Sequence, residues 1–150
     1  MKEFILDVNV DLKTGNPGCP EYFLRDLRSH KKIGLVRGGA KYNAEVGRKG
    51  ALLDLFNEML RTGKVRTIPD DVVDAKESDL MLRLRECLGT FPAECNDIHI
   101  FALSSVSSCL NIVSNDIGIS TCRDLIRNRI GHQHCPAVRL IRSQQAYDDS

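Results

Sequence analysis

The chain has no tryptophan, and phenylalanine and tyrosine together make up only 5% of its 150 residues. It also lacks a long apolar run, because even the uncharged stretch Ile98–Ser114 contains seven polar residues. This excludes a membrane-spanning helix. Near the N-terminus only three apolar residues separate Glu3 from Asp7, so no secretory signal peptide is expected. A hydrophobic fraction of 42% and a charged fraction of 27% are those of an ordinary globular protein, which we expect in the cytoplasm.

Neither sign of charge dominates, because 21 Lys and Arg residues balance 20 Asp and Glu residues to a formal net charge of +1. The charges are nevertheless segregated along the chain. Residues 25–49 contain eight basic and two acidic residues, residues 70–79 contain five acidic residues and one basic residue, and residues 123–142 carry five arginines against one aspartate. Basic clusters could bind along a polyanion such as nucleic acid. Exposed helix faces carry similar charge, however, so the pattern alone does not establish nucleic-acid binding.

The six cysteines are spread along the chain without a Cys-x-x-Cys pair, and in a cytoplasmic protein we expect free thiols. One group of residues has the chemistry of metal ligands: Cys122, His132, His134 and Cys135. Their spacing matches no familiar zinc finger. We therefore interpret this segment as a polar turn before Pro136.

Short apolar runs alternate with amphipathic segments. The runs predict strands at residues 4–10, 33–36, 65–68, 110–113 and 137–141. The amphipathic segments predict helices at residues 20–32, 40–61 with a break near Gly47 and Gly50, 70–88, 96–107 and 119–129. This alternation is typical of a three-layer α/β/α fold with a mainly parallel central sheet of about five strands. We expect a single domain over residues 1–142 and a polar, frayed tail over residues 143–150.

Three carboxylates fall where such folds bind ligands, beyond the carboxyl ends of the strands. Asp7 lies near the carboxyl end of the first predicted strand, Asp116 follows the fourth, and Asp97 lies in the first turn of the helix at 96–107. A helix start would also explain Asp97, and a turn would explain Asp116. Asp7 is harder to explain in this way, because a carboxylate within an apolar strand is costly unless something pairs with it.

Other catalytic motifs do not occur. The sequence has no Gly-x-Gly-x-x-Gly after a strand, no P-loop and no Gly-x-Ser-x-Gly nucleophile motif. The adjacent glycines Gly38 and Gly39 are weak evidence for a phosphate site.

Four segments, taken together and in this order, resemble PIN-domain nucleases. In Ile5–Val10 an aspartate is followed two positions later by an asparagine, as in the opening strand of that family. Gly38–Val46 resembles the segment that leads into the family's helical glutamate, and Glu94–Leu103 is similar to the helix that carries its third acid. Ile112–Asp116 looks like the family's fourth-strand ending, a small hydroxyl residue followed by Asn and Asp. The chain departs from the family in two respects. Asn96 stands where a frequent variant has a second acid, and the region 69–89, which is rich in acidic residues, matches no family signature.

The resemblance implies a metal-dependent endoribonuclease, whose acids would be Asp7, Glu45, Asp97 and Asp116. At separations of about 5 Å and an effective dielectric near 20, each ionised pair repels by roughly 3 kcal/mol. Six such pairs cost on the order of 15–20 kcal/mol, so either protons or divalent cations must relieve the repulsion. Oxygen ligands favour Mg²⁺ or Mn²⁺ over zinc.

Polar neighbours of these acids are the expected supporting residues. Asn9, Ser114 and Asn115 are candidates for hydrogen-bond donors that orient the carboxylates, although strand-end and turn hydrogen bonds would also explain them.

Basic residues near the acids are the expected contacts to substrate phosphates: Arg37, Lys41 and Arg48. So few contacts predict moderate, salt-sensitive binding. Most of the aromatic residues lie on apolar stripes, and Tyr42 is the one candidate for stacking on a base.

Family members of this size are often the toxin of a toxin–antitoxin pair, which implies RNA as substrate, a protein inhibitor (antitoxin) and a homodimer as partners. The apolar helix at 51–61 would either supply a dimer face or pack on the sheet. A catalytically inactive PIN-like module that binds RNA or protein is the main alternative, and metal uptake separates the two. A receiver-like signalling domain is a further alternative, which the segment Val65–Asp70 fits poorly.

Overall fold

The computed structural model describes residues 1–29, 31–135 and 138–150, and its centre is one sheet of five strands in the order β3-β2-β1-β4-β5. All neighbouring strands pair in parallel. The strands are β1 (Lys2–Leu6), β2 (Ile33–Gly38), β3 (Val65–Ile68), β4 (Asn111–Val113) and β5 (Arg139–Ile141). The predicted parallel α/β/α architecture is therefore confirmed. The first residue of the last predicted strand, Ala137, lies outside the described residues.

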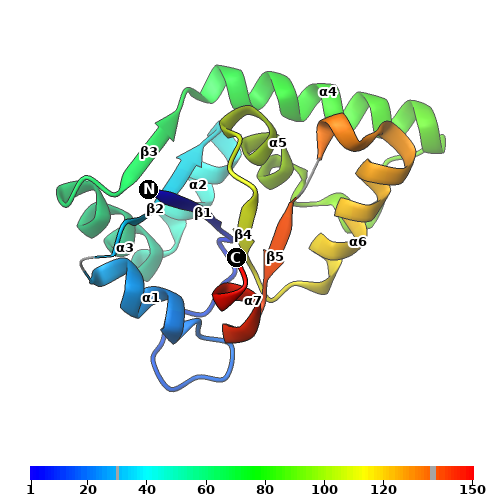
Figure 1. The fold of residues 1–150 in the computed structure, drawn as a ribbon. Coiled ribbons are helices and arrows are strands. Elements are labelled where there is room, and N and C mark those ends of the chain that lie inside the picture. Colours follow the sequence, from blue (N-terminus) through cyan, green and yellow to red (C-terminus); the bar gives the residue numbers. More distant parts are fainter. Residues whose placement is uncertain (30, 136–137) are drawn as a thin grey trace.

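Helices flank both faces of the sheet. They are α1 (Glu21–Arg28), α2 (Ala40–Arg48), α3 (Gly50–Arg61), α4 (Asp70–Leu88), α5 (Ile98–Ser107), α6 (Ile117–Leu125) and α7 (Gln144–Asp148). Short turns of helix are η1 (Ala93–Cys95), η2 (Ile126–Ile130) and η3 (His132–His134). Figure 1 shows α4, α5 and α6 grouped on one side of the sheet and α1 and α7 on the other. None of the described helices is both long enough and apolar enough to cross a membrane.

The central strands are buried on both faces, which explains their uninterrupted apolar sequences. Phe4, Ile5 and Leu6 of β1 are fully buried, and so are Leu35 and Val36 of β2. Alternating polar residues are absent from these strands because helices cover both sides. The edge strand β3 is partly exposed and carries polar residues.

The acidic start of α4 has a structural role that the sequence did not disclose. The carboxylate of Asp70 accepts a hydrogen bond from the Gly39 amide, and that of Asp74 accepts one from the Ala40 amide, each at 3.0 Å. Negative charge is favourable there because these amides begin α2. Gly39 has a φ of +95°, and a Cβ atom on it would lie 2.8 Å from Cγ1 of Val73. Gly39 therefore serves the contact between α2 and α4, and its amide and that of Ala40 bind carboxylates of the chain itself.

The C-terminal residues are not frayed, so that prediction was wrong. Ser143 caps α7 by accepting a hydrogen bond from the Ala146 amide at 3.2 Å. The ring of Tyr147 packs against Phe4, 5.6 Å between centroids, and its hydroxyl donates to Asp26 at 2.9 Å. One aromatic side chain thus anchors a polar segment to the core, a long-range contact that local composition does not reveal.

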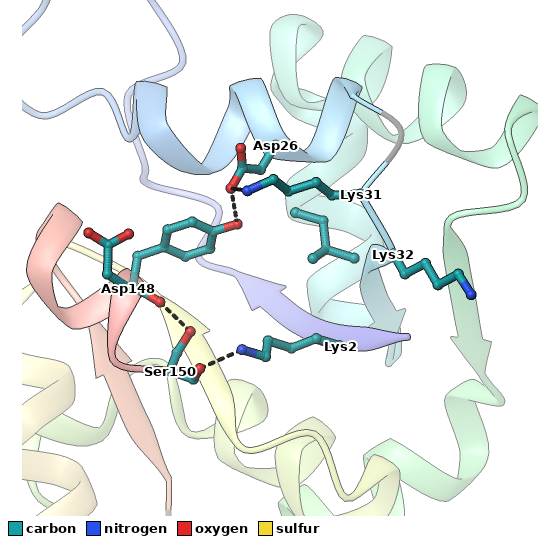
Figure 2. Close-up of a pocket in the computed structure, with 8 residues that line it drawn as sticks. Lys2, Asp26, Lys31, Lys32, Asp148 and Ser150 are labelled. Carbon is teal, nitrogen blue, oxygen red and sulfur yellow. Dashed lines mark hydrogen bonds and ion pairs between the residues drawn. The ribbon is translucent and has the colours of Figure 1, made fainter.

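A pocket of about 410 Å³ lies beside α7, where β1 and β2 begin. Figure 2 shows Lys2, Lys31 and Lys32 around it. Lys31 pairs with Asp26 at 3.3 Å, and Lys2 donates to the backbone oxygen of Ser150. Lys31 thus has its counter-charge within the chain, and the pocket lies at the edge of the sheet opposite to Asp7.

Two of the six cysteines are joined, which corrects the expectation of free thiols. A disulfide links Cys95 in η1 to Cys122 in α6, 27 residues apart in sequence. Cys122 is therefore not available as a metal ligand. His134 contacts Lys76 instead, with 2.8 Å between Nδ1 and Nζ. The interpretation of residues 132–135 as a turn agrees with the short helix η3, while Pro136 lies outside the described residues.

Candidate acidic site at the carboxyl edge of the sheet

The order of the strands creates one crevice at the carboxyl edge of the sheet. From β1 the chain runs to β2 and β3 on one side, and then returns to β4 and β5 on the other. The switch point therefore lies between β1 and β4, where ligands of open α/β sheets bind. Asp7 follows β1 directly, and Ser114 and Asp116 follow β4.

Asp7 is a buried carboxylate, only 1% exposed. Its Oδ2 accepts a hydrogen bond from the Ser114 hydroxyl at 2.7 Å, and its Oδ1 accepts a longer one, 3.3 Å, from the Asn9 amide. Burial raises the pKa of Asp7, these hydrogen bonds partly offset the rise, and the charges of Asp97 and Asp116 add to it. No ion pair among the described residues includes Asp7. Its charge is therefore left for something else to balance.

Ser114 connects two of the predicted acids. While its hydroxyl donates to Asp7, the same oxygen accepts a hydrogen bond from the Asp116 amide at 3.0 Å. Asp116 is exposed and caps α6, because its Oδ1 accepts from the Gly118 amide at 2.9 Å. Through these two contacts Ser114 connects the Asp7 carboxylate to the backbone of Asp116, at the ends of neighbouring strands.

Glu45 and Asp97 reach the crevice from two helices. Glu45 lies on α2, and Asp97 is the residue directly before α5. Burial raises the pKa of Glu45, and Lys41 opposes the rise while the charge of Asp97 adds to it. Burial likewise raises the pKa of Asp97, again opposed by Lys41 and increased by the charge of Asp116. The four predicted acids therefore interact electrostatically, although they come from four separate segments.

His99 is a site residue that sequence reasoning missed. Carboxylate oxygens of Glu45 and Asp97 and a ring nitrogen of His99 all lie within 4.8 Å of one another. Its side chain is 1% exposed, and neither ring nitrogen has a hydrogen-bond partner in the described part of the chain. Burial lowers the pKa of His99 to about 4, so the ring is neutral at pH 7. The available signal was a polar ring in the otherwise apolar start of α5, two residues after Asp97.

Basic residues rim this acidic crevice. A pocket of about 400 Å³ is lined by Val8, Asn9, Lys41, Glu45, Arg48, Lys49 and Asp97. Lys41 is held at the rim by its hydrogen bond to the Asn96 carbonyl, at 2.6 Å. Lys49, which was not predicted, lies 3.5 Å from Oδ1 of Asn9. The pocket thus combines carboxylates with cations that could contact a phosphate.

Two predicted residues have other partners. The guanidinium of Arg37 donates twice to Oδ1 of Asn43, at 3.0 and 2.9 Å, and lies 5.0 Å from the ring centroid of Phe56. Arg37 does not line the acidic pocket. Asn115 donates to the Gly18 carbonyl at 2.7 Å, so its amide fixes a loop and not a carboxylate.

The side chain of Tyr42, the candidate for stacking on a base, is fully buried and therefore cannot stack on a bound nucleic acid. Its hydroxyl donates to the Leu6 carbonyl at 2.6 Å, one residue before Asp7, and its ring packs on Phe56. Tyr42 therefore lies on the buried face of α2, whereas Lys41 and Glu45 of the same helix line the pocket.

Replacing Tyr42 by phenylalanine tests this structural role. The Leu6 carbonyl then loses a buried donor, which costs about 1–3 kcal/mol. We expect the free energy of unfolding, measured by urea denaturation, to fall by this amount while RNA affinity stays unchanged. An unaltered unfolding curve with weaker RNA binding would contradict the assignment.

Comparisons of the chain with models of known families, with curated proteins and with solved structures find no match. The site must therefore be interpreted from its own geometry.

Proposed function

We propose that this chain is an endoribonuclease that hydrolyses phosphodiester bonds with Mg²⁺ or Mn²⁺ bound at the acidic crevice. The observation that carries the proposal is Asp7, a buried carboxylate at the switch point whose charge is opposed by no cation among the described residues. The choice of RNA as substrate rests on the resemblance of four segments to PIN-domain nucleases.

The residues present fit a divalent cation. Raised pKa values at Asp7, Glu45 and Asp97 mean that their negative charges are poorly compensated within the chain. Together with Asp116 they offer oxygen donors of the kind that Mg²⁺ and Mn²⁺ prefer. When bound, such an ion lowers the pKa of a coordinated water and stabilises charge on a phosphoryl oxygen.

The chain's own residues would then position the reactants. Ser114 holds the Asp7 carboxylate in one rotamer through its 2.7 Å hydrogen bond. Lys41 and Arg48 lie on the same rim of the pocket, where they would bind phosphates on either side of the scissile bond. Asp97, which lines the pocket, or Asp116, which is exposed beyond β4, would align the attacking water.

Lys41 is the basic residue whose removal should most affect substrate binding. We expect Lys41→Ala to weaken binding of a non-cleavable 2′-O-methyl RNA and to reduce the slope of log Kd against log salt by about 1. Lys32→Ala is the matched control, because Lys32 lies at the opposite edge of the sheet (Figure 2). Equal salt slopes for Lys41→Ala and the wild type would remove Lys41 from the substrate path.

A cleavage assay tests the proposed function itself. Total RNA and single-stranded DNA are incubated with the protein in Mg²⁺, in Mn²⁺ or in chelator. We expect RNA cleavage that requires the divalent cation and is lost in Asp116→Asn. Cleavage that survives the chelator would contradict the proposal, and absence of both cleavage and Mn²⁺ uptake would favour a binding module that does not cut.

The partner proposals follow from the same resemblance: a protein inhibitor, a homodimer and a cytoplasmic location. The apolar face of α3 does not supply a dimer surface, because its side chains are buried in the chain: Leu52, Leu55, Phe56 and Met59. A homodimer would have to use another surface.

A further inference from the structure

We propose that His99 is a metal ligand, and that Glu45, Asp97 and His99 form a mixed nitrogen and oxygen site that selects Mn²⁺ over Mg²⁺. This inference rests on the proposed function and refines it, because an all-carboxylate site would not make this choice. It adds a ligand of a different chemical type to the four acids.

The first support is geometric. The three candidate ligand atoms lie within 4.8 Å of one another. Ligands of one cation at about 2.1 Å lie on a sphere around it, so two of them are separated by at most roughly 4.2 Å. Small side-chain rotations are therefore enough to bring these three atoms around one ion.

The second support is the state of the His99 ring. Buried polar groups in folded proteins nearly always have hydrogen-bond partners, and each exception requires an explanation. Both ring nitrogens of His99 are buried, and neither has a partner among residues 1–29, 31–135 and 138–150. The nearest carboxylate oxygen, Oε2 of Glu45, is 3.7 Å from Nε2, which is too long for a hydrogen bond. A cation between Nε2 of His99 and the Glu45 carboxylate would be a partner for both of these groups.

The surroundings keep the ring in place. Tyr42 packs beside His99, with 6.3 Å between ring centroids, and Tyr42 is itself fixed by its hydrogen bond to Leu6. His99 follows Asp97 by two residues at the start of α5, so one helix end presents both donors. Glu45 reaches them from α2. Packing against Tyr42 therefore restricts the position of the imidazole ring.

The selectivity follows from ligand chemistry. Imidazole nitrogen suits transition metals, whereas Mg²⁺ prefers oxygen and gains little from a nitrogen donor. Two carboxylates and one imidazole therefore favour Mn²⁺, which accepts both ligand types. Removal of His99 should reduce this preference and leave the binding of Mg²⁺ by oxygen ligands nearly intact.

The test combines spectroscopy of the wild type with calorimetric titrations of variants. Pulsed electron paramagnetic resonance of the Mn²⁺-loaded wild type should show coupling to one directly bound ¹⁴N nucleus. In His99→Gln that coupling should disappear and the Kd for Mn²⁺ should rise roughly ten- to a hundredfold, while the Kd for Mg²⁺ changes less than about threefold. The control is His132→Gln, which replaces an exposed histidine outside the site. It should behave like the wild type.

The outcomes separate this inference from the proposed function. Bound Mn²⁺ without nitrogen coupling, together with metal-dependent cleavage, would overturn the role of His99 and leave the nuclease standing. Nitrogen coupling without any cleavage would support the metal site and contradict the nuclease. Failure of the wild type to bind Mn²⁺ would overturn both. Because the spectroscopic test uses the wild type, it holds even if His99→Gln does not fold.

Discussion

Replacing Asp7 by asparagine should reduce metal-dependent cleavage by on the order of a thousandfold. This corresponds to about 4 kcal/mol of transition-state stabilisation, the size expected when a catalytic metal ion loses a central ligand. The change keeps the shape of the side chain and an oxygen that can accept from Ser114, but it removes the charge that attracts a cation. Initial rates of RNA cleavage at saturating Mn²⁺ measure the effect.

The fold should survive this change. Because burial disfavours the ionised form of Asp7, the metal-free Asp7→Asn protein should be at least as stable as the wild type at neutral pH. Asp54→Asn is the matched control, since Asp54 is an exposed acid on α3 and should be neutral in both assays. Wild-type cleavage by Asp7→Asn would show that the acidic crevice is not the catalytic centre.

The second large effect concerns the free energy of unfolding, which should depend on pH and on bound divalent cations. Asp7, Glu45 and Asp97 have raised pKa values, so the folded state holds their protons more tightly than the unfolded state. Their contribution is present below the ordinary values of 3.8 and 4.5 and is lost as the pH rises through the folded-state pKa values. The metal-free protein should therefore lose this part of its stability on going from about pH 4 to neutral pH.

Divalent cations should restore the loss. At a hundred times its Kd, Mn²⁺ adds about 2.7 kcal/mol to the free energy of unfolding.

Asp26 and Asp79 have lowered pKa values, because burial is outweighed by hydrogen bonds and nearby cations, and they act in the opposite direction. The quantity to measure is therefore the difference between wild type and Asp7→Asn in urea unfolding, from pH 4 to 8, with and without Mn²⁺. A difference independent of pH would contradict the raised pKa of Asp7.

Local sequence was informative wherever burial alone decides structure. The apolar run at Phe4–Leu6 is typical of a strand covered on both faces, and the alternation of such runs with amphipathic segments predicts the parallel sheet. Asp7 stood out for the same reason, because a carboxylate at the end of a buried strand is costly. The sheet topology then brings Asp7 and Asp116 to the same edge, because the carboxyl ends of neighbouring parallel strands meet there.

The remainder depends on contacts between distant segments, which composition and periodicity do not encode. Tyr147 anchors the C-terminal helix to Phe4, and the disulfide joins Cys95 to Cys122, but neither partner reveals the other in sequence. His99 lies in an apolar helix, and nothing near it in sequence shows that Glu45 of α2 lies beside it. Tyr42 is buried although its neighbours Lys41 and Glu45 line the pocket, and its position in the sequence did not show this.

The most direct test of the central claim is the position of a bound cation. Anomalous scattering from a crystal soaked in Mn²⁺ should place the ion about 2.0–2.3 Å from carboxylate oxygens in the crevice between β1 and β4. The account predicts Asp7 among the ligands or bonded to a water that the ion holds. An ion bound only at another surface, or Asp7 paired with a lysine or arginine in the crystal, would contradict it.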